Sequence, residues 1–265
     1  MDCALRGTLN RLLPLWGTCE SDAGGSVIVA AFPYLLPEKY YDGRNIARYA
    51  TLPDYHEVCG ARLAEVCEAL RGRYPSRHFA WYCDNSPLPE VEMAIKAGLG
   101  RRGRHNLLIT PEYGSWIFLG EIVTDFTLED SPPRSLPPPP CANCDLCQKA
   151  CPGGALDGKT FRRERCVSFL SQSNRALTAA EAALLQKAGT AWGCDICQEV
   201  CPCNTGRTPK PLPAFLKEVY PRLTLPPPPG RAYTWRGIAV LERNLRIINE
   251  GASRAREHAK KGAIL

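Results

Sequence analysis

Eight cysteines lie in two closely spaced runs between residues 141 and 201, and they constrain this chain more than any other feature. The first run, CANCDLCQKACP, spells C-x-x-C-x-x-C-x-x-x-C-P, the spacing that binds paired [4Fe–4S] clusters. Three thiolates from one tight loop can bind three irons of a single cubane. We expect the fourth cysteine to start a helix that points toward the other cluster, with the proline in its first turn.

The second run is Cys194, Cys197 and Cys201-Pro202, and Cys166 precedes it at a distance. It is the same motif with its first gap stretched by the inserted segment 167–193. A pseudo-twofold relation between the runs predicts two ligand sets of four cysteines each. These are Cys141, Cys144, Cys147 and Cys201 for one cluster, and Cys151, Cys166, Cys194 and Cys197 for the other.

A pair of structural zinc sites is the alternative reading of these cysteines. Zinc ribbons pair two C-x-x-C knuckles, and they have no use for a third cysteine at the next position or for a terminal Cys-Pro. The chain has only four histidines, so thiolate is the soft ligand that it offers to a metal. No apolar run is long enough to span a bilayer, and the first residues lack a signal-peptide pattern. We therefore expect a cytoplasmic protein without a membrane partner, whose 14 cysteines are not disulfides.

Two proline-rich stretches, 131–140 and 225–230, interrupt the sequence as stiff connectors. They predict three parts, which are an α/β domain over 1–130, a double-cluster domain over 131–210, and a linker, helix and basic tail over 211–265. The formal net charge of +6 is mild and is compatible with a polyanionic partner without requiring one.

The hydrophobic pattern predicts an α+β fold class. The continuous apolar run at 26–32 is typical of a strand buried on both faces, and 54–70 has helical spacing with Asp54 as its N-cap. The apolar face of that helix contains Cys59 and Cys67, which we expect to be core residues. Further strands are predicted at 79–83, 106–110 and 116–124, and further helices at 90–97 and at 235–249, the last ending at Gly251.

The α/β part implies that the two clusters deliver electrons to an acceptor, because a bare ferredoxin needs only the length of the middle part. No P-loop is visible. The segment Gly98–Gly103 has G-x-G-x-x-G spacing, but it follows a predicted helix and leads into a strand, which is the wrong context for a dinucleotide.

Several segments resemble the epoxyqueuosine reductase family. They are CANCDLCQKACPGGAL, RRERCVSFL and WGCDICQEVCPCN around the cysteines, GRNIARYATLPDYH and CDNSPLPEVEMAIKAGLGRRGRHNLLITPEYGSWIFLGEIVTD before them, and WRGIAVLERNLRIIN after them. The resemblance extends from about residue 26 to residue 249, with the motifs in the same order and spacing.

The resemblance implies a nitroreductase-like α/β domain that binds cobalamin, followed by a ferredoxin-like domain and a short helical tail. An external donor of the flavodoxin or ferredoxin kind would supply electrons through the clusters to cobalamin. Cobalamin would then remove the epoxide oxygen of epoxyqueuosine in a transfer RNA, which leaves queuosine. The chain is thus expected to be an oxidoreductase with transfer RNA as a partner.

Asp84 matches the position of the family's catalytic aspartate, so the resemblance implies that it donates a proton. In an apolar pocket its pKa would be raised. The alternative is a turn aspartate, since Asp-Asn-Ser-Pro is also a turn sequence.

Other matches imply contacts with cobalamin. Arg48 and Tyr49 lie near the family's cobalamin pocket, and so do Asp54, Tyr55 and His56. Arg104 stands where relatives often have lysine. Ser115 lies in Gly114-Ser115-Trp116, which together with Gly120-Glu121 is expected to let the backbone approach the corrin closely.

The chain departs from the family where full-length members continue into helical repeats after the 235–249 helix. We therefore retain two alternatives. One is a cobalamin-dependent reductase of a small molecule, and the other is a non-enzymatic two-cluster electron-transfer protein. The basic tail, with Arg254, Arg256, Lys260 and Lys261, could contact phosphates or be solvated.

Overall fold

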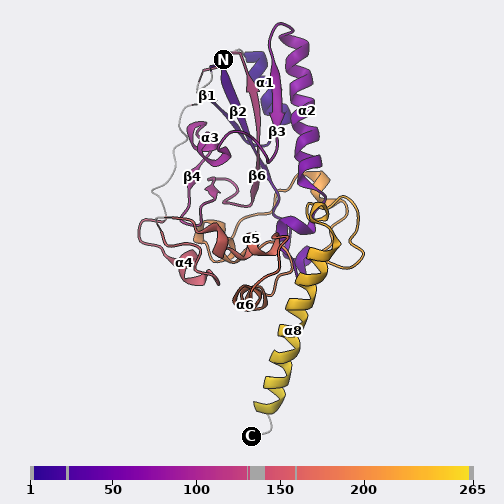
Figure 1. The fold of residues 1–265 in the computed structure, drawn as a ribbon. Helices are drawn as coiled ribbons and strands as arrows, with labels where there is room; N and C mark the ends of the chain where they lie inside the picture. Colours follow the sequence, from indigo (N-terminus) through magenta and orange to yellow (C-terminus); the bar gives the residue numbers. More distant parts are fainter. Residues whose placement is uncertain (1–2, 22–23, 130, 132–140, 159, 263–265) are drawn as a thin grey trace. The chain divides into compact units, whose positions relative to one another are not determined.

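The computed structural model describes residues 3–21, 24–129, 131, 141–158 and 160–262. Two compact units make up the chain, and both are discontinuous in sequence (Figure 1). The first unit comprises Met1–Leu36, Asp54–Cys144 and Pro202–Lys217, and the second comprises Pro37–Pro53, Asp145–Cys201 and Glu218–Leu265. The domain boundaries at 130 and 210 stay a prediction.

A four-stranded antiparallel sheet forms the centre of the first unit. Its order is β1 (Trp16–Glu20), β2 (Ser26–Pro33), β6 (Ile117–Thr124) and β3 (Phe79–Tyr82). The two central strands, β2 and β6, pair along their whole length from Ser26↔Thr124 to Pro33↔Ile117. Every residue of β2 is buried, as its continuous apolar run predicts.

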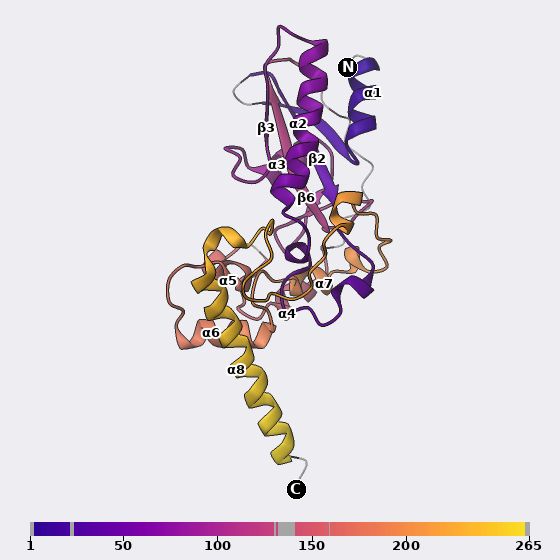
Figure 2. The ribbon, with the colours of Figure 1, turned by 90° about the vertical axis from the view of Figure 1, so that its right-hand side faces the viewer.

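Helices cover both faces of this sheet. Helices α1 (Cys3–Leu12) and α2 (Tyr55–Arg73) lie on one face, and α3 (Glu90–Lys96) lies on the other (Figures 1 and 2). The N-cap prediction for α2 is confirmed, since the Asp54 carboxylate accepts the backbone N–H of His56 at 3.0 Å. Cys59 and Cys67 are fully buried on α2, which confirms them as core residues.

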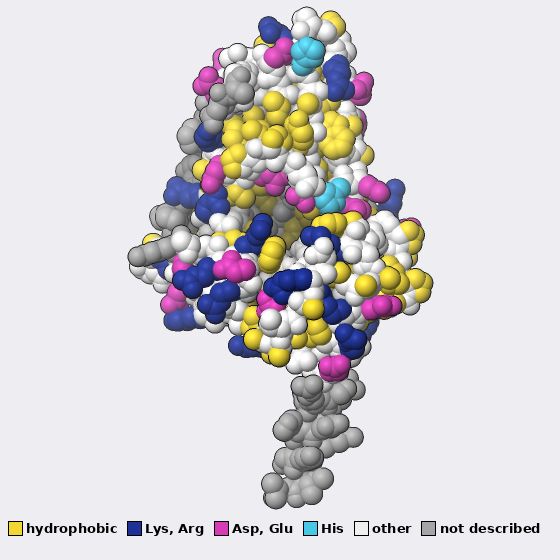
Figure 3. Space-filling model, viewed as in Figure 1, with side chains coloured by type: hydrophobic (Ala, Val, Ile, Leu, Met, Phe, Trp, Pro, Cys, Tyr) yellow, Lys and Arg dark blue, Asp and Glu magenta, His cyan; other side chains and the backbone are white. Residues whose placement is uncertain are grey.

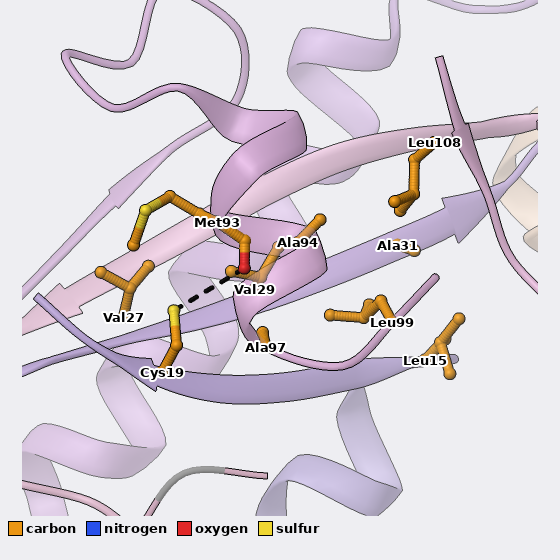
Figure 4. Close-up of a cluster of buried hydrophobic side chains, with 10 residues drawn as sticks. All are labelled: Leu15, Cys19, Val27, Val29, Ala31, Met93, Ala94, Ala97, Leu99 and Leu108. Carbon is orange, nitrogen blue, oxygen red and sulfur yellow. Dashed lines mark hydrogen bonds between the residues drawn. The ribbon is translucent and has the colours of Figure 1, made fainter. Parts of the chain in front are cut away.

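The core between α3 and the sheet is built from small and branched side chains (Figure 4). Met93 of α3 and Ala97, the residue after its end, pack against Val27 and Val29 of β2. The Cys19 thiol of β1 donates a weak hydrogen bond to the Met93 carbonyl at 3.7 Å. Neither α1 nor β1 was predicted from the sequence, because this region shows no clear period.

The segment after α3 forms only two-residue strands, β4 (Arg101–Arg102) and β5 (Leu108–Ile109). The strand predicted at 106–110 is thus shorter than expected. Asn106 has φ +67°, a left-handed conformation that an extended strand cannot include. The chain turns at Pro111–Gly114, where Thr110 and Gly114 form an isolated bridge.

The second unit is helical. It contains α4 (Leu146–Ala150), α5 (Val167–Ser171), α6 (Ala179–Ala188), α7 (Ile196–Glu199) and α8 (Ile238–Gly262). Helices α4 and α7, which lie at equivalent positions of the two cysteine runs, pack against each other, and α6 packs against α5 and α8. The α+β class predicted for the chain is therefore confirmed.

Two local predictions for this unit are wrong. Cys151 ends α4 and does not start a helix, because Gly153 and Gly154 (φ +59°) turn the chain at once. Helix α8 also continues past Gly251 and does not end there, with the Gly251 Cα against the Gln186 side chain of α6. The side chains of the predicted basic tail lie outside the described residues.

None of the helices in the described ranges combines the length and the apolar character that crossing a membrane requires.

Candidate functional site

Asp84 lies just beyond the end of β3, in a turn with unusual backbone conformation. Asp84 and Asn85 have φ values of +59° and +49°, and both are in the left-handed region that non-glycine residues seldom adopt. The Asn85 N–H donates to the Asp84 carboxylate at 2.9 Å. Two consecutive residues of this kind persist only where surrounding contacts hold them, and such strain is common at functional sites.

The second oxygen of the Asp84 carboxylate faces the start of α2. Tyr55 donates its hydroxyl to it at 2.9 Å, and His56 Nε2 lies 3.3 Å from it. The other ring nitrogen, His56 Nδ1, is 2.6 Å from the Asp54 carboxylate. Asp54, His56 and Asp84 therefore form a continuous ionic chain that joins the N-terminus of α2 to the end of β3.

The two carboxylates determine the protonation state of His56. The hydrogen bonds to Asp54 and then to Asp84 raise the pKa of His56 to about 10, so its imidazole carries a proton at neutral pH. The hydrogen bond from His56 in turn lowers the pKa of Asp84 to about 2. Both ring nitrogens of His56 are occupied by carboxylates, which suits a proton carrier and not a metal ligand.

The expectation of a raised pKa at Asp84 is therefore wrong for this conformation. The Asp84 side chain is half exposed and bonded to a cation, whereas a raised pKa needs an apolar pocket without such a partner. In this conformation the proton of the site is held by His56, which the sequence placed near the cofactor pocket without a role. The sequence signal for His56 is its position two residues after Asp54 at a predicted helix start, where the N-cap carboxylate can contact its ring.

Aromatic rings support the start of α2. The Tyr55 ring stacks on Phe118 with centroids 4.2 Å apart and on the His56 imidazole at 4.0 Å. Phe118 also contacts Tyr34 at 4.5 Å and Phe215 at 5.5 Å. These aromatic contacts orient the Tyr55 hydroxyl and the His56 ring toward Asp84.

In the second unit, Arg48 lies in an ion-pair network. It donates to both carboxylate oxygens of Glu38 at 2.9 and 3.2 Å, and its guanidinium lies over the Tyr41 ring. Its backbone N–H donates to Asp195 Oδ2 at 2.6 Å, and Arg44 donates to the same oxygen at 3.1 Å. Asp195 follows Cys194, a predicted cluster ligand, so this network holds the second cysteine run, a role that the sequence did not reveal.

The other predicted cofactor contacts also meet protein atoms. The Tyr49 ring packs against Gly193, where an added Cβ would lie 2.8 Å from the ring. Arg104 donates to the carbonyls of Cys144 at 3.1 Å and Ala142 at 3.2 Å, and so holds the first cysteine loop. As cobalamin contacts, Arg48, Tyr49, Arg104 and Ser115 stay predictions.

Ser115 is buried and bonded to Asn204, whose carboxamide accepts the Ser115 N–H and donates to its hydroxyl, both at 2.8 Å. The close approaches expected between glycine and the corrin are made to protein. Gly114 (φ +62°) faces the Asn204 side chain, and Gly120 faces Leu63. These glycines are therefore explained by packing.

The predicted second set of cluster cysteines lies within the second unit. Burial raises the pKa of the Cys194 thiol to about 12, and the nearby Cys166 and Cys151 add to the effect. The Cys197 thiol has the same three thiols as electrostatic neighbours. The structure therefore brings Cys151, Cys166, Cys194 and Cys197 together, and iron would have to displace their protons.

The predicted first set is divided between the units, with Cys141 and Cys144 in the first and Cys147 and Cys201 in the second, so this set stays a prediction from the sequence. In the described part of the chain, no three His, Cys, Asp or Glu side chains lie close enough together to hold a single metal ion.

Comparisons with known proteins agree with the cysteine pattern. A family model for a 4Fe-4S double cluster binding domain matches residues 140–204, which include all eight cysteines. A second family model, epoxyqueuosine reductase QueG, DUF1730, matches residues 22–85, which include Asp84.

Similar proteins bear the same name. The epoxyqueuosine reductase of Listeria monocytogenes is 35% identical over 244 residues, which cover 83% of this chain. The chain spans 62% of that relative's length. An epoxyqueuosine reductase crystallised with an epoxyqueuosine-modified tRNA-Tyr stem loop shares the fold, with a TM-score of 0.79 at 22% identity over 92% of this chain and 80% of that one.

The epoxyqueuosine reductase of Bacillus subtilis is also similar, at 26% identity and a TM-score of 0.71, over 84% of this chain and 63% of that one. In that structure the loop of a catalytic aspartate is swung out of the active site. The double-cluster cysteines, the sequence around Asp84 and these likenesses lead to one conclusion: the chain belongs to the epoxyqueuosine reductase family.

Proposed function

We propose that this chain is a cobalamin-dependent oxidoreductase that uses two [4Fe–4S] clusters to reduce epoxyqueuosine in a transfer RNA to queuosine. The observation that carries the proposal is the Asp54–His56–Asp84 chain. It keeps a proton at neutral pH beside an apolar surface, in a protein whose other module has the double-cluster cysteine pattern.

The reaction defines what the chain must supply. Conversion of an epoxide to an alkene breaks both C–O bonds and releases the oxygen as water, which takes two electrons and two protons. Two one-electron clusters can deliver the electrons in succession. Cobalamin, when bound and reduced, would supply the nucleophile that attacks the epoxide.

The proton path is formed by this chain's own residues. His56 holds a proton between two carboxylates, and Asp84, which it contacts at 3.3 Å, is the half-exposed end of the path. We infer that Asp84 passes a proton to the leaving oxygen only once its pair with His56 is broken, because pKa values of about 10 for His56 and about 2 for Asp84 keep the proton on His56 while the pair is intact. Tyr55 donates to the same carboxylate oxygen at 2.9 Å and keeps it directed during the transfer.

The surface beside Asp84 suits a large apolar macrocycle. Hydrophobic side chains gather over the first unit in Figure 3. In the same unit, Leu119 and Val123 flank Glu121 on the α3 face of β6, and Leu88 and Val91 follow the Asp84 turn, all partly exposed. These side chains would hold cobalamin in our proposal. No position for it follows from Arg48, Tyr49, Arg104 or Ser115, whose described contacts are with protein.

Transfer RNA is the proposed substrate, because a relative was crystallised with a modified transfer RNA stem loop. We also propose a cytoplasmic location and an electron donor of the flavodoxin or ferredoxin kind.

The first experiment is anaerobic reconstitution of the clusters with added cobalamin, followed by removal of the excess. We expect about eight irons and one cobalamin per chain, and turnover of a stem loop that contains epoxyqueuosine. Asp84→Asn should keep iron and cobalamin but lower turnover by about 100-fold or more, the usual loss for a general acid. Glu57→Gln, an exposed change on the same helix start, is the matched control.

Two outcomes would contradict the proposal. Full iron without retained cobalamin would leave a two-cluster electron carrier. Retained cobalamin without turnover of the stem loop would indicate a reductase of another substrate.

A further inference from the structure

Two acidic residues of the second cysteine run have arginine partners from a distant segment of the chain. Asp195 directly follows Cys194, and Glu199 is the last residue of α7. Arg44 donates from one guanidinium nitrogen to Asp195 Oδ2 at 3.1 Å and from the other to the Glu199 carboxylate. Arg48 donates its backbone N–H to the same Asp195 oxygen at 2.6 Å, and its Nε lies 3.5 Å from Glu199 Oε1. Two cations therefore meet two anions within the cysteine run.

Backbone hydrogen bonds join the two segments independently of these side chains. The Ala47 N–H donates to the Trp192 carbonyl at 2.8 Å, and the Ala191 N–H donates to the Asn45 carbonyl at 2.7 Å. The loop that contains the arginines is therefore placed by main-chain contacts. Replacing one arginine side chain should leave these contacts intact.

The ion pair between Arg44 and Asp195 is buried on its acidic side. The Asp195 side chain is 1% exposed, whereas that of Arg44 is 24% exposed. Asp195 Oδ1 is buried without a hydrogen-bond partner in the part of the chain that the structure describes. Water screens a buried charge only weakly, so loss of the arginine would leave the carboxylate uncompensated.

The neighbours of this carboxylate are predicted cluster ligands. Cys194 is the residue before Asp195, and Cys197 lies two residues after it. These two cysteines bind the same cluster whether or not the two runs exchange their last cysteine. A [4Fe–4S] cluster gains one negative charge when it accepts an electron, so a nearby cation favours the reduced form and a nearby anion favours the oxidised form.

We propose that the Arg44–Asp195 ion pair sets the reduction potential of the cluster bound through Cys194 and Cys197, because Arg44 cancels the charge of a buried carboxylate beside that cluster. Arg44 and Asp195 act through the cluster and are positioning residues for its charge. The functional meaning rests on the electron-transfer role proposed above, whereas the contacts exist without it.

The test is a reductive titration of the cluster-reconstituted protein at pH 8, followed by electron paramagnetic resonance. Arg44→Gln should retain about eight irons per chain and lower one of the two cluster potentials. At a given applied potential we expect the ratio of reduced to oxidised cluster to fall roughly tenfold, as Coulomb's law gives for a unit charge about 10 Å away in a protein interior. For a one-electron couple this corresponds to about 59 mV.

Three further variants distinguish an effect of charge from an effect of structure. Asp195→Asn keeps an oxygen for the backbone N–H of Arg48 and should raise the same potential. The double change Arg44→Gln with Asp195→Asn should return the potential close to the wild-type value, because a cation and an anion are removed together. Arg44→Lys keeps the charge and should also match the wild type. The control is Arg62→Gln, which removes a guanidinium from an exposed ion pair with Glu65 on α2 and should leave both potentials unchanged.

Unchanged potentials in both Arg44→Gln and Asp195→Asn would overturn the proposal. Shifts in the same direction in these two variants, or loss of iron in Arg44→Gln and Arg44→Lys alike, would indicate a structural role and would also overturn it. If Arg44→Gln alone loses iron, the direction of the shift in Asp195→Asn decides. The titration requires neither cobalamin nor transfer RNA, so its result is separate from the test of the proposed function.

Discussion

At the scale of single residues, the proton held between Asp54 and Asp84 belongs to His56. Its imidazole lies between the Asp54 and Asp84 carboxylates at 2.6 and 3.3 Å. A lone histidine near a helix start is an ordinary surface residue by composition alone. What raises its pKa is first the hydrogen bond to Asp54, two residues earlier, and then the Asp84 carboxylate, which lies at a strand end 28 residues later in the chain.

His56 should make the stability of the protein depend on pH. Its pKa rises from 6.5 to about 10 on folding, so its contribution is complete below pH 6.5 and is lost as the pH rises toward 10. The urea midpoint of the wild type should therefore decline between pH 6.5 and pH 10, and the decline should be smaller in His56→Gln. Asp84, with its pKa lowered from 3.8 to about 2, adds stability that disappears as the pH falls from 4 to 2.

His78→Gln serves as the control for this prediction, because His78 is exposed at the start of β3 and its replacement should leave the pH profile unchanged. A profile in His56→Gln that matches the wild type throughout would show that the ion pairs contribute nothing measurable.

At the scale of secondary-structure elements, the start of α2 does two jobs with one carboxylate. Asp54 accepts the His56 backbone N–H as the N-cap of the helix, and the same oxygen binds His56 Nδ1. The cap is a local feature that the sequence predicts, because Asp is a preferred N-cap residue before an amphipathic run. The contact between His56 Nδ1 and Asp54 depends on the side-chain rotamer of His56. That rotamer is held by stacking on Tyr55, which itself stacks on Phe118.

Two substitutions of Asp54 separate its role as the N-cap from its ionic contact with His56. Asp54→Ser keeps a capping oxygen but removes the charge, whereas Asp54→Ala removes both. Asp54→Ala should lower the free energy of unfolding by about 1 kcal/mol more than Asp54→Ser, the usual value of an N-cap. Both variants should lower the pKa of His56 equally, as measured by NMR titration of its ring. An equal loss of stability in the two variants would mean that capping does not matter here.

Elements with a strong local pattern were predicted well, and those that depend on long-range contacts were not. Strand β2 and helix α2 follow from an apolar run and a helical period. Helix α6 was missed although Thr178 and Glu181 form a complete capping box, a signal present in the sequence. Helix α8 passes through Gly251 because α6 packs against it there, a contact that no local propensity contains.

At the scale of the whole molecule, the clusters depend on cysteines that are far apart in the sequence. Cys151, Cys166, Cys194 and Cys197 are electrostatic neighbours in the structure, and their assignment to one cluster stays a prediction. Arg104 and the Arg44–Asp195 pair brace the two cysteine loops from other parts of the chain.

The crossed arrangement predicts which cysteines belong together. Cys201→Ser should perturb the same electron paramagnetic resonance signal as Cys141→Ser, and Cys151→Ser the same signal as Cys166→Ser. Each change should damage one cluster and lower the iron content by up to about half. Cys203→Ser is the control, since this neighbour is outside both predicted sets. A Cys201→Ser spectrum that matches Cys194→Ser would show that each run binds its own cluster.

The sequence by itself determined the cluster chemistry, the family and the position of Asp84, because ligand spacing and motif order are properties of short segments. It also determined the buried strand and the capped helix, which follow from local periodicity. Only the tertiary structure decided the ionisation of Asp84, because His56 and Tyr55 reach its carboxylate from the start of α2. It also decided that Arg48, Arg104 and Ser115 contact protein, since the partner of a polar side chain is chosen by packing at a distance.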